Sequence, residues 1–196
     1  MADTGTPRPR TGSARAKILD AAARLFYAHG MAATGIDTVT AEAGVAKMSL
    51  YNNFSSKEEL TLAYLQERHR AWLDLYRHRL EGTRTPRQRV LAVFDAYIDH
   101  ASAAHEHGFR GCGLLNAAAE LPARAPGRER VRQHKEQVEA LLAGHLEEIT
   151  TPQTAARTAR HCSFLLEGAM ARAGLEGTPD HLLQARAIAA SLVDTL

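Results

Sequence analysis

Apolar residues recur every three or four positions along most of the chain, and glycines or prolines interrupt the pattern at intervals. This spacing is typical of helices with one buried face, whereas strict alternation would indicate a strand. No segment alternates in that way, and the helix-favouring residues Ala, Leu, Arg and Glu are abundant. The pattern predicts an all-α chain with helices over residues 14–29, 36–43, 47–53, 57–81, 86–105, 112–121, 127–149, 152–173 and 179–195.

Threonine–proline pairs mark three of these helix starts, because a capping hydroxyl precedes a residue whose φ already suits a helix. Two capping boxes are also predicted, one between Thr85 and Gln88 and one between Ser56 and Glu59. The pairs are Thr85-Pro86, Thr151-Pro152 and Thr178-Pro179.

Residues 36–60 contain two short helical patterns separated by Gly44 and Val45. Helix, tight turn and helix in this order are typical of a helix-turn-helix motif. The apolar positions are Ile36, Val39 and Ala43 in the first pattern and Leu50 and Phe54 in the second. The other side of the second helix then carries Lys47, Met48, Ser49, Tyr51 and Asn52, side chains that suit a DNA groove.

This region resembles the DNA-binding domain of TetR-type transcriptional regulators. The similarity begins with residues 16–30 and continues through the motif to residue 60. Two positions depart from the family pattern: Ala46 replaces a frequent capping Ser or Thr, and Thr40 replaces a common Ala. The similarity is carried by Gly30, Thr34-Gly35, Gly44-Val45, Leu50-Tyr51, Phe54 and Ser56-Lys57.

The resemblance implies about nine helices in two domains. Residues 1–56 would form an N-terminal arm and a three-helix DNA-binding domain, and residues 57–196 a helical ligand-binding and dimerisation domain. The helix predicted over residues 57–81 would be about 37 Å long and would connect them. The resemblance further implies a homodimer that binds a palindromic operator in double-stranded DNA and responds to a small molecule. Repression is the commoner mode in the family, and activation stays open.

The exposed side of the second motif helix supplies the candidates for reading bases. Asparagine can bind adenine with two hydrogen bonds, lysine favours guanine, and methionine can contact the thymine methyl group. An ordinary polar helix face is the alternative. We predict base contacts from Lys47, Met48, Ser49 and Asn52, and phosphate contacts from Thr34, Thr38, Tyr51 and Lys57.

Aromatic and aliphatic residues of the second half are candidates for an apolar ligand cavity. The predicted lining is Trp72, Tyr76, Phe94, Tyr97, Phe109 and Leu114, with His100, Asn116 and Glu120 as polar groups that orient the ligand. Such a lining favours a mainly apolar or aromatic, uncharged molecule. The alternative is that these aromatic residues form plain core.

Small and apolar residues at helical spacing mark the last two predicted helices, and such residues allow helices to approach closely. In the resembled family this pair of helices packs against its symmetry mate. A hairpin packed only within one subunit is the alternative. The predicted interface residues are Leu165, Ala169, Leu183, Ala187 and Ala190.

No catalytic motif occurs in the chain, so we predict neither an enzyme nor a cofactor. His100, His105, His107 and Cys112 are good zinc ligands by type, but their spacing matches no compact zinc site, and we predict no metal. The rival hypotheses are a metal-responsive regulator and a helical enzyme that retains a helix-turn-helix fold.

Charge and hydropathy set the remaining limits. The net charge is only +2, but residues 8–57 carry an excess of basic over acidic side chains, a modest footprint for nucleic acid. No apolar run approaches the roughly 18 residues of a membrane helix, and the N-terminus has no apolar signal core. We therefore expect a cytoplasmic protein that does not bind membranes, with Cys112 and Cys162 as free thiols.

Overall fold

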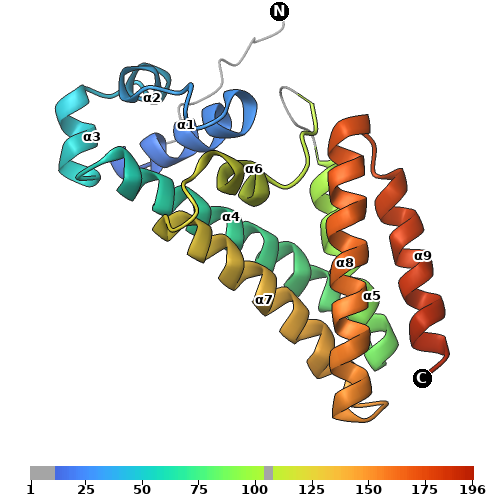
Figure 1. Ribbon diagram of the computed structural model, residues 1–196. Coiled ribbons are helices and arrows are strands. Elements are labelled where there is room, and N and C mark those ends of the chain that lie inside the picture. The colour runs from blue at the N-terminus through green and yellow to red at the C-terminus, as the bar shows by residue number, and fades with distance from the viewer. Residues whose placement is uncertain (1–11, 104–107) are drawn as a thin grey trace, which may run out of the picture. The chain divides into compact units, whose positions relative to one another are not determined.

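The computed structural model describes residues 12–103 and 108–196, and these residues form nine α-helices and no strand (Figure 1). The predicted all-α class is therefore confirmed. None of the described helices is both long enough and apolar enough to span a membrane. The helices are α1 (Ala14–His29), α2 (Ile36–Ala43), α3 (Lys47–Asn53), α4 (Lys57–Leu80), α5 (Pro86–Ser102), α6 (Gly113–Glu120), α7 (Pro126–Leu146), α8 (Pro152–Glu176) and α9 (Asp180–Asp194).

The observed helix bounds lie close to the predicted ones. The largest differences are at the C-terminal ends of α7, which stops at Leu146, and of α8, which continues to Glu176. Residues 104 and 105, the predicted end of the fifth helix, lie outside the described residues. The described chain divides after Leu60 into two compact units, and α4 begins in the first and continues in the second.

The first unit is held together by a small apolar core. Ile18 and Val39 are fully buried, and Phe26 from α1 is almost so. Gly44 ends α2 in the left-handed region with φ of 64°, where its amide donates to the carbonyls of Thr40 and Ala41. A glycine tolerates this conformation without strain, which explains why the turn of the motif contains one.

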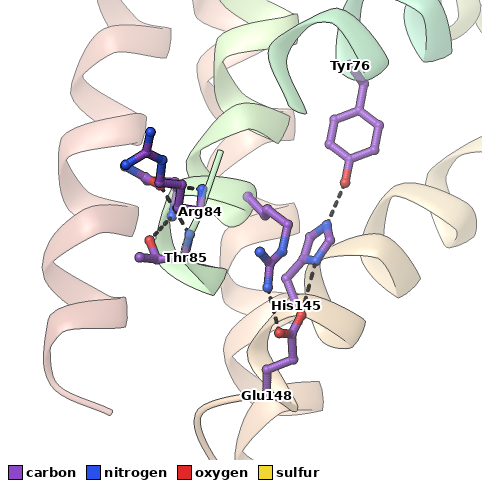
Figure 2. Close-up of polar contacts among 7 residues, drawn as sticks. Tyr76, Arg84, Thr85, His145 and Glu148 are labelled. Carbon is purple, nitrogen blue, oxygen red and sulfur yellow. Dashed lines mark hydrogen bonds and ion pairs between the residues drawn. The ribbon is translucent and has the colours of Figure 1, made fainter. Parts of the chain in front are cut away.

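Two of the three threonine–proline predictions are confirmed. The Thr85 hydroxyl accepts from the Gln88 amide at 3.2 Å, and the Gln88 carboxamide accepts from the Thr85 amide at 3.1 Å, which completes the capping box. Thr151 likewise accepts from the Thr154 amide at 3.3 Å. Figure 2 shows the Thr85 cap at the start of α5.

The prediction for Thr178 is wrong, since α9 begins one residue later than expected. Pro179 itself is the N-cap, and no side chain caps this helix. The amides of Leu182 and Leu183 both donate to the Pro179 carbonyl, at 2.9 and 3.1 Å. The threonine hydroxyl therefore lies one position too far from the free amides of the first turn.

The predicted Ser56–Glu59 box forms only in part. The Ser56 hydroxyl accepts from the Glu59 amide at 3.1 Å. The Glu59 carboxylate instead accepts from the amide and the hydroxyl of Ser55, at 2.7 and 2.6 Å. These hydrogen bonds lower the pKa of Glu59. They also connect Ser55, in the turn after α3, to the first turn of α4.

The second unit is a helical bundle in which α8 packs against both α7 and α9, and α5 packs against both α7 and α9. Figure 1 shows α8 and α9 as antiparallel neighbours. Ion pairs also join α5 to α9, where Arg186 pairs with Asp95 and Arg87 pairs with Asp194, both at 2.6 Å. The fully buried core includes Val90, Val93, Phe94, Leu142, Leu146 and Leu182.

A chain of polar contacts connects α4 to the C-terminal end of α7 (Figure 2). The Tyr76 hydroxyl lies 2.6 Å from His145 Nε2, and His145 Nδ1 lies 3.8 Å from Glu148 Oε1. Arg89 of α5 donates to the same carboxylate at 2.5 Å. Burial lowers the pKa of His145, so a neutral imidazole accepts from or donates to the buried Tyr76 hydroxyl. Tyr76 is therefore engaged in an internal contact.

The loop before α6 approaches α8 very closely. A Cβ atom added to Gly174 would lie 2.6 Å from Gly111 Cα and 2.7 Å from Gly111 N. Gly111 itself has a positive φ of 81°. Because the obstructing atoms are backbone, no side-chain rotation can relieve the contact.

We expect Gly174→Ala to destabilise the protein by about 1–3 kcal/mol, the usual cost of overpacking. Gly144→Ala is the matched control, since a Cβ there meets nothing within 4 Å and alanine favours a helix interior. Urea denaturation of the two variants measures the difference. A Gly174→Ala variant as stable as Gly144→Ala would show that the loop moves away at little cost.

Candidate functional site

Helix α3 is short and is anchored from one side only. Leu50 is fully buried, and Phe54, which follows the helix, is 1% exposed. The Arg15 guanidinium lies 4.7 Å from the centroid of the Phe54 ring. The N-cap residue, Ala46, provides no side-chain hydrogen bond, as its substitution for a Ser or Thr implied. The helix is instead held by the buried Leu50 and Phe54, and the missing cap costs about 1 kcal/mol.

The opposite side of α3 is exposed and chemically mixed. Met48 is 69% exposed and Tyr51 45%, unusual values for large apolar side chains. Lys47 and Asn52 are also exposed, and Ser49 is half-buried. The predicted base-contacting residues and Tyr51 therefore do share one face, with a cation, an amide, a thioether and a phenol.

Lys47 already has a partner within the motif. Its ammonium lies 2.8 Å from a carboxylate oxygen of Asp37 in the first turn of α2, and both side chains are largely exposed. The hydrogen bond to Asp37 raises the pKa of Lys47. Exposed ion pairs contribute little to stability, so a base or a phosphate can compete for this lysine.

The predicted phosphate contacts divide into two groups. Thr38 and Tyr51 are exposed, and Lys57 is half-buried at the N-terminus of α4, where free amides attract anions. Thr34 is different: it is 2% exposed, and its hydroxyl donates to the Gly30 carbonyl at 2.7 Å. The predicted contact from the Thr34 side chain is therefore corrected to a structural role in the turn after α1.

Comparison with known proteins identifies the family in which this motif occurs. Residues 18–64 match the family model for bacterial regulatory proteins of the tetR family. Residues 86–189, more than half of the chain, match the model for the C-terminal domain of tetracyclin repressor-like proteins. The chain belongs to the TetR family. It is therefore a helix-turn-helix DNA-binding transcriptional regulator.

Solved structures of this family agree over nearly the whole chain. SCO4454, a TetR-family regulator from Streptomyces coelicolor, is 31% identical, with a TM-score of 0.83 over 93% of this chain and 95% of its own. A putative TetR regulator from Streptomyces avermitilis is also 31% identical, with a TM-score of 0.77 over 94% of this chain and 98% of its own. The arrangement of helices is thus that of TetR regulators.

Curated relatives match about half of the chain. The transcriptional activator FasR of Mycolicibacterium smegmatis is 38% identical over 101 residues, which cover 52% of this chain and 44% of FasR. The repressor KstR2 of Mycobacterium tuberculosis is 32% identical over 94 residues, which cover 46% of this chain and 45% of KstR2. The matches span less than half of either relative, and the two relatives regulate in opposite directions.

The ligand-lining residues predicted for the second unit of this TetR regulator do not all meet. Trp72, Tyr97, His100 and Leu114 line one cavity, together with Arg68, Leu75, Cys112, Gly113 and His134. The cavity has a volume of about 30 Å³. This is room for about two water molecules and not for an organic ligand.

The other predicted lining residues have different surroundings. Phe94 is fully buried core and Tyr76 contacts His145. The Phe109 ring packs edge-on against His100, with centroids 5.7 Å apart. Asn116 donates to the Arg110 carbonyl at 2.9 Å, and Glu120 is exposed at the end of α6. Close packing, which residue type and spacing do not reveal, separates these five residues from the cavity.

His134 of α7 was missed in the sequence and is only 3% exposed. It occupies the buried stripe formed by Val131, Val138 and Leu142, at helical spacing. A polar residue on an otherwise apolar stripe is the signal that could have identified it. Burial lowers its pKa to about 3, so this imidazole is neutral near pH 7.

Helices α8 and α9 leave an apolar face uncovered. Of the predicted interface residues, Leu183 and Ala187 are exposed, and Leu165, Ala169 and Ala190 are half-buried. Two larger side chains were missed, Phe164 and Leu175, which are 65% and 84% exposed, and Ile188 beside Ala187 is 49% exposed. The exposed stripe of α8 has helical spacing in the sequence and consists of Phe164, Gly168, Ala171 and Leu175. It was not predicted because the buried stripe through Leu166 and Met170 is more apolar.

Within residues 12–103 and 108–196, no group of three or more His, Cys, Asp and Glu side chains is arranged to hold a metal ion. His105 and His107, two members of the sequence cluster, lie outside the described residues. Cys112 and Cys162 are both buried and free, as expected. Burial raises the pKa of the Cys162 thiol to about 11.

Proposed function

We propose that this TetR-family regulator is a homodimeric repressor, which binds a palindromic operator through α3 and is released by a small molecule. The observation that carries the proposal is the exposed face of α3, where Lys47, Met48 and Asn52 stand opposite the buried Leu50. A recognition helix needs this division, because one face must fix the helix and the other must reach base edges.

Dimerisation is supported by the uncovered apolar face of α8 and α9. The two helices pack against each other within one subunit, so a hairpin alone does not bury Phe164, Leu175, Leu183 or Ile188. A face made from two helices can supply the area of a stable interface, which is about 800 Å² per partner. A second copy of the chain is the occupant we propose, since a two-fold axis matches a palindromic site.

Ligand control follows from thermodynamic linkage. A molecule that binds more tightly to the DNA-free protein must weaken operator binding. DNA in turn weakens the binding of that molecule by the same factor. Helix α4 is continuous from Lys57 to Leu80 and belongs to both units, which makes it the element through which such coupling would act. The ligand that we propose has an apolar or aromatic body and binds in the second unit.

Selection of operator sequences from a random DNA library, with the full-length protein, tests this function. We expect enrichment of an inverted repeat whose half-sites lie about 34–36 Å apart or at a multiple of that distance. Enrichment of sequences without two-fold symmetry would contradict the dimeric mode. A library that shows no enrichment would contradict sequence-specific binding.

A further inference from the structure

His134 lines two cavities of different character in the second unit. The first is the apolar cavity of about 30 Å³ beside Trp72 and Tyr97. The second lies between α4 and α7, has a volume of about 130 Å³, and has a polar lining. Its polar residues are Gln66, His69, Arg130, Gln133, His134 and Gln137.

The chemistry of the polar cavity favours an anion. Its lining contains the Arg130 guanidinium, three carboxamides and two imidazoles, and it contains no carboxylate. Guanidinium groups bind carboxylates through two parallel hydrogen bonds, and carboxamide N–H groups can add further donors. Arg130, Gln133 and Gln137 are exposed, so the cavity opens to solvent along α7.

Two residues that line the apolar cavity, Trp72 and Tyr97, carry a buried polar atom without a hydrogen-bond partner. Trp72 Nε1 and the Tyr97 hydroxyl are buried and make no hydrogen bond within the described residues. Arg68 supplies a guanidinium to this lining. Buried polar groups in proteins are nearly always paired, and an unpaired group calls for an explanation.

His134 is the one lining residue that the two cavities share. Its Nδ1 lies 3.0 Å from Nδ1 of His69, and its ring packs edge-on against Trp72 with centroids 5.3 Å apart. Because burial keeps the ring neutral, it can rotate without moving a charge through the interior. Displacement of this one side chain would join the polar and the apolar cavity.

We propose that the effector is a small monocarboxylate with a compact apolar body, bound between α4 and α7. The carboxylate contacts Arg130 and the neighbouring carboxamides, and the apolar body displaces His134 and occupies the cavity of Trp72 and Tyr97. Compounds with several negative charges do not suit the site, because the inner cavity is mainly apolar. That this acid controls DNA binding rests on the proposed function. That the acid binds at this site does not.

Trp72 is the only tryptophan in the chain, so its fluorescence reports on this site alone. The DNA-free, full-length protein is titrated with benzoate, phenylacetate and hexanoate and with their primary amides. We expect a saturable change in Trp72 emission with at least one acid, at a concentration at least tenfold lower than with its amide. Arg130→Gln should weaken the binding of that acid at least tenfold.

Arg132→Gln is the matched control on the same helix. Arg132 pairs with Glu129 and Glu136 and lines a separate cavity, not either of the two that His134 shares, so this variant should bind the acid within twofold of the wild type. The proposal is overturned if no acid changes the emission, if the amides bind equally well, or if Arg130→Gln binds like Arg132→Gln. Binding detected by calorimetry without a change in Trp72 emission would also overturn it. None of these outcomes depends on operator affinity. They therefore test the ligand proposal separately from the proposed function.

Discussion

Phe164→Arg should convert the dimer to monomers and lower operator affinity by about 10²–10⁴-fold, the usual gain from two linked contacts. The side chain is 65% exposed in one subunit, so the monomer tolerates the arginine. In the proposed dimer the same position is buried, and an unpaired charge there costs several kcal/mol of association free energy, on the order of 3–5. Sedimentation velocity and operator titration measure the two effects.

Ile149→Arg is the control for this substitution. Ile149 is also an exposed apolar residue, at 40%, but it lies after α7 and outside the α8–α9 face. This variant should remain dimeric and bind the operator normally. A dimer that persists in Phe164→Arg would place the interface on another surface.

Asn52→Ala should reduce discrimination between operator and random DNA by about 1–3 kcal/mol, because a side chain that contacts a base pair carries that much selectivity. Stability should change little, since Asn52 is exposed. Asn53→Ala is the matched control: the Asn53 amide donates to the Ser49 carbonyl at 2.8 Å, within the helix. Competition binding at fixed salt gives the selectivity of each variant.

Equal selectivity in Asn52→Ala and the wild type would remove Asn52 from the base contacts. A similar loss in both asparagine variants would indicate a disturbed α3 and not a lost contact. Circular dichroism of the two proteins separates these cases, because only a disturbed helix alters the spectrum.

The DNA-binding motif was predictable because its signals are local. Gly44 fixes the turn, Leu50 and Phe54 are four residues apart on the buried side, and the remaining residues of α3 must then face outward. Thr34 was misjudged because a threonine hydroxyl can bind a phosphate or a nearby carbonyl equally well. Its contact with Gly30 depends on the path of the turn, which residue types do not specify.

The proposed ligand site was less predictable because it depends on contacts between distant segments. His69 and His134 are 65 positions apart, and their close contact follows from the pairing of α4 with α7. Aromatic residue type led to Phe94 and Tyr76, which the structure uses for packing and for an internal hydrogen bond. In the sequence, Arg130, Gln133 and Gln137 of α7 are typical of an ordinary solvated helix face. Only the cavity beside them in the structure suggests another role.

The most direct test of sequence-specific regulation is the ratio of operator affinity to random-DNA affinity, measured for the wild-type protein at one near-physiological salt concentration. We expect a ratio of at least about 10³, the lower range for specific DNA-binding proteins. A ratio near one, with both affinities falling equally as salt rises, would mean that only phosphate contacts hold the DNA and would contradict the assignment of α3 as a recognition helix.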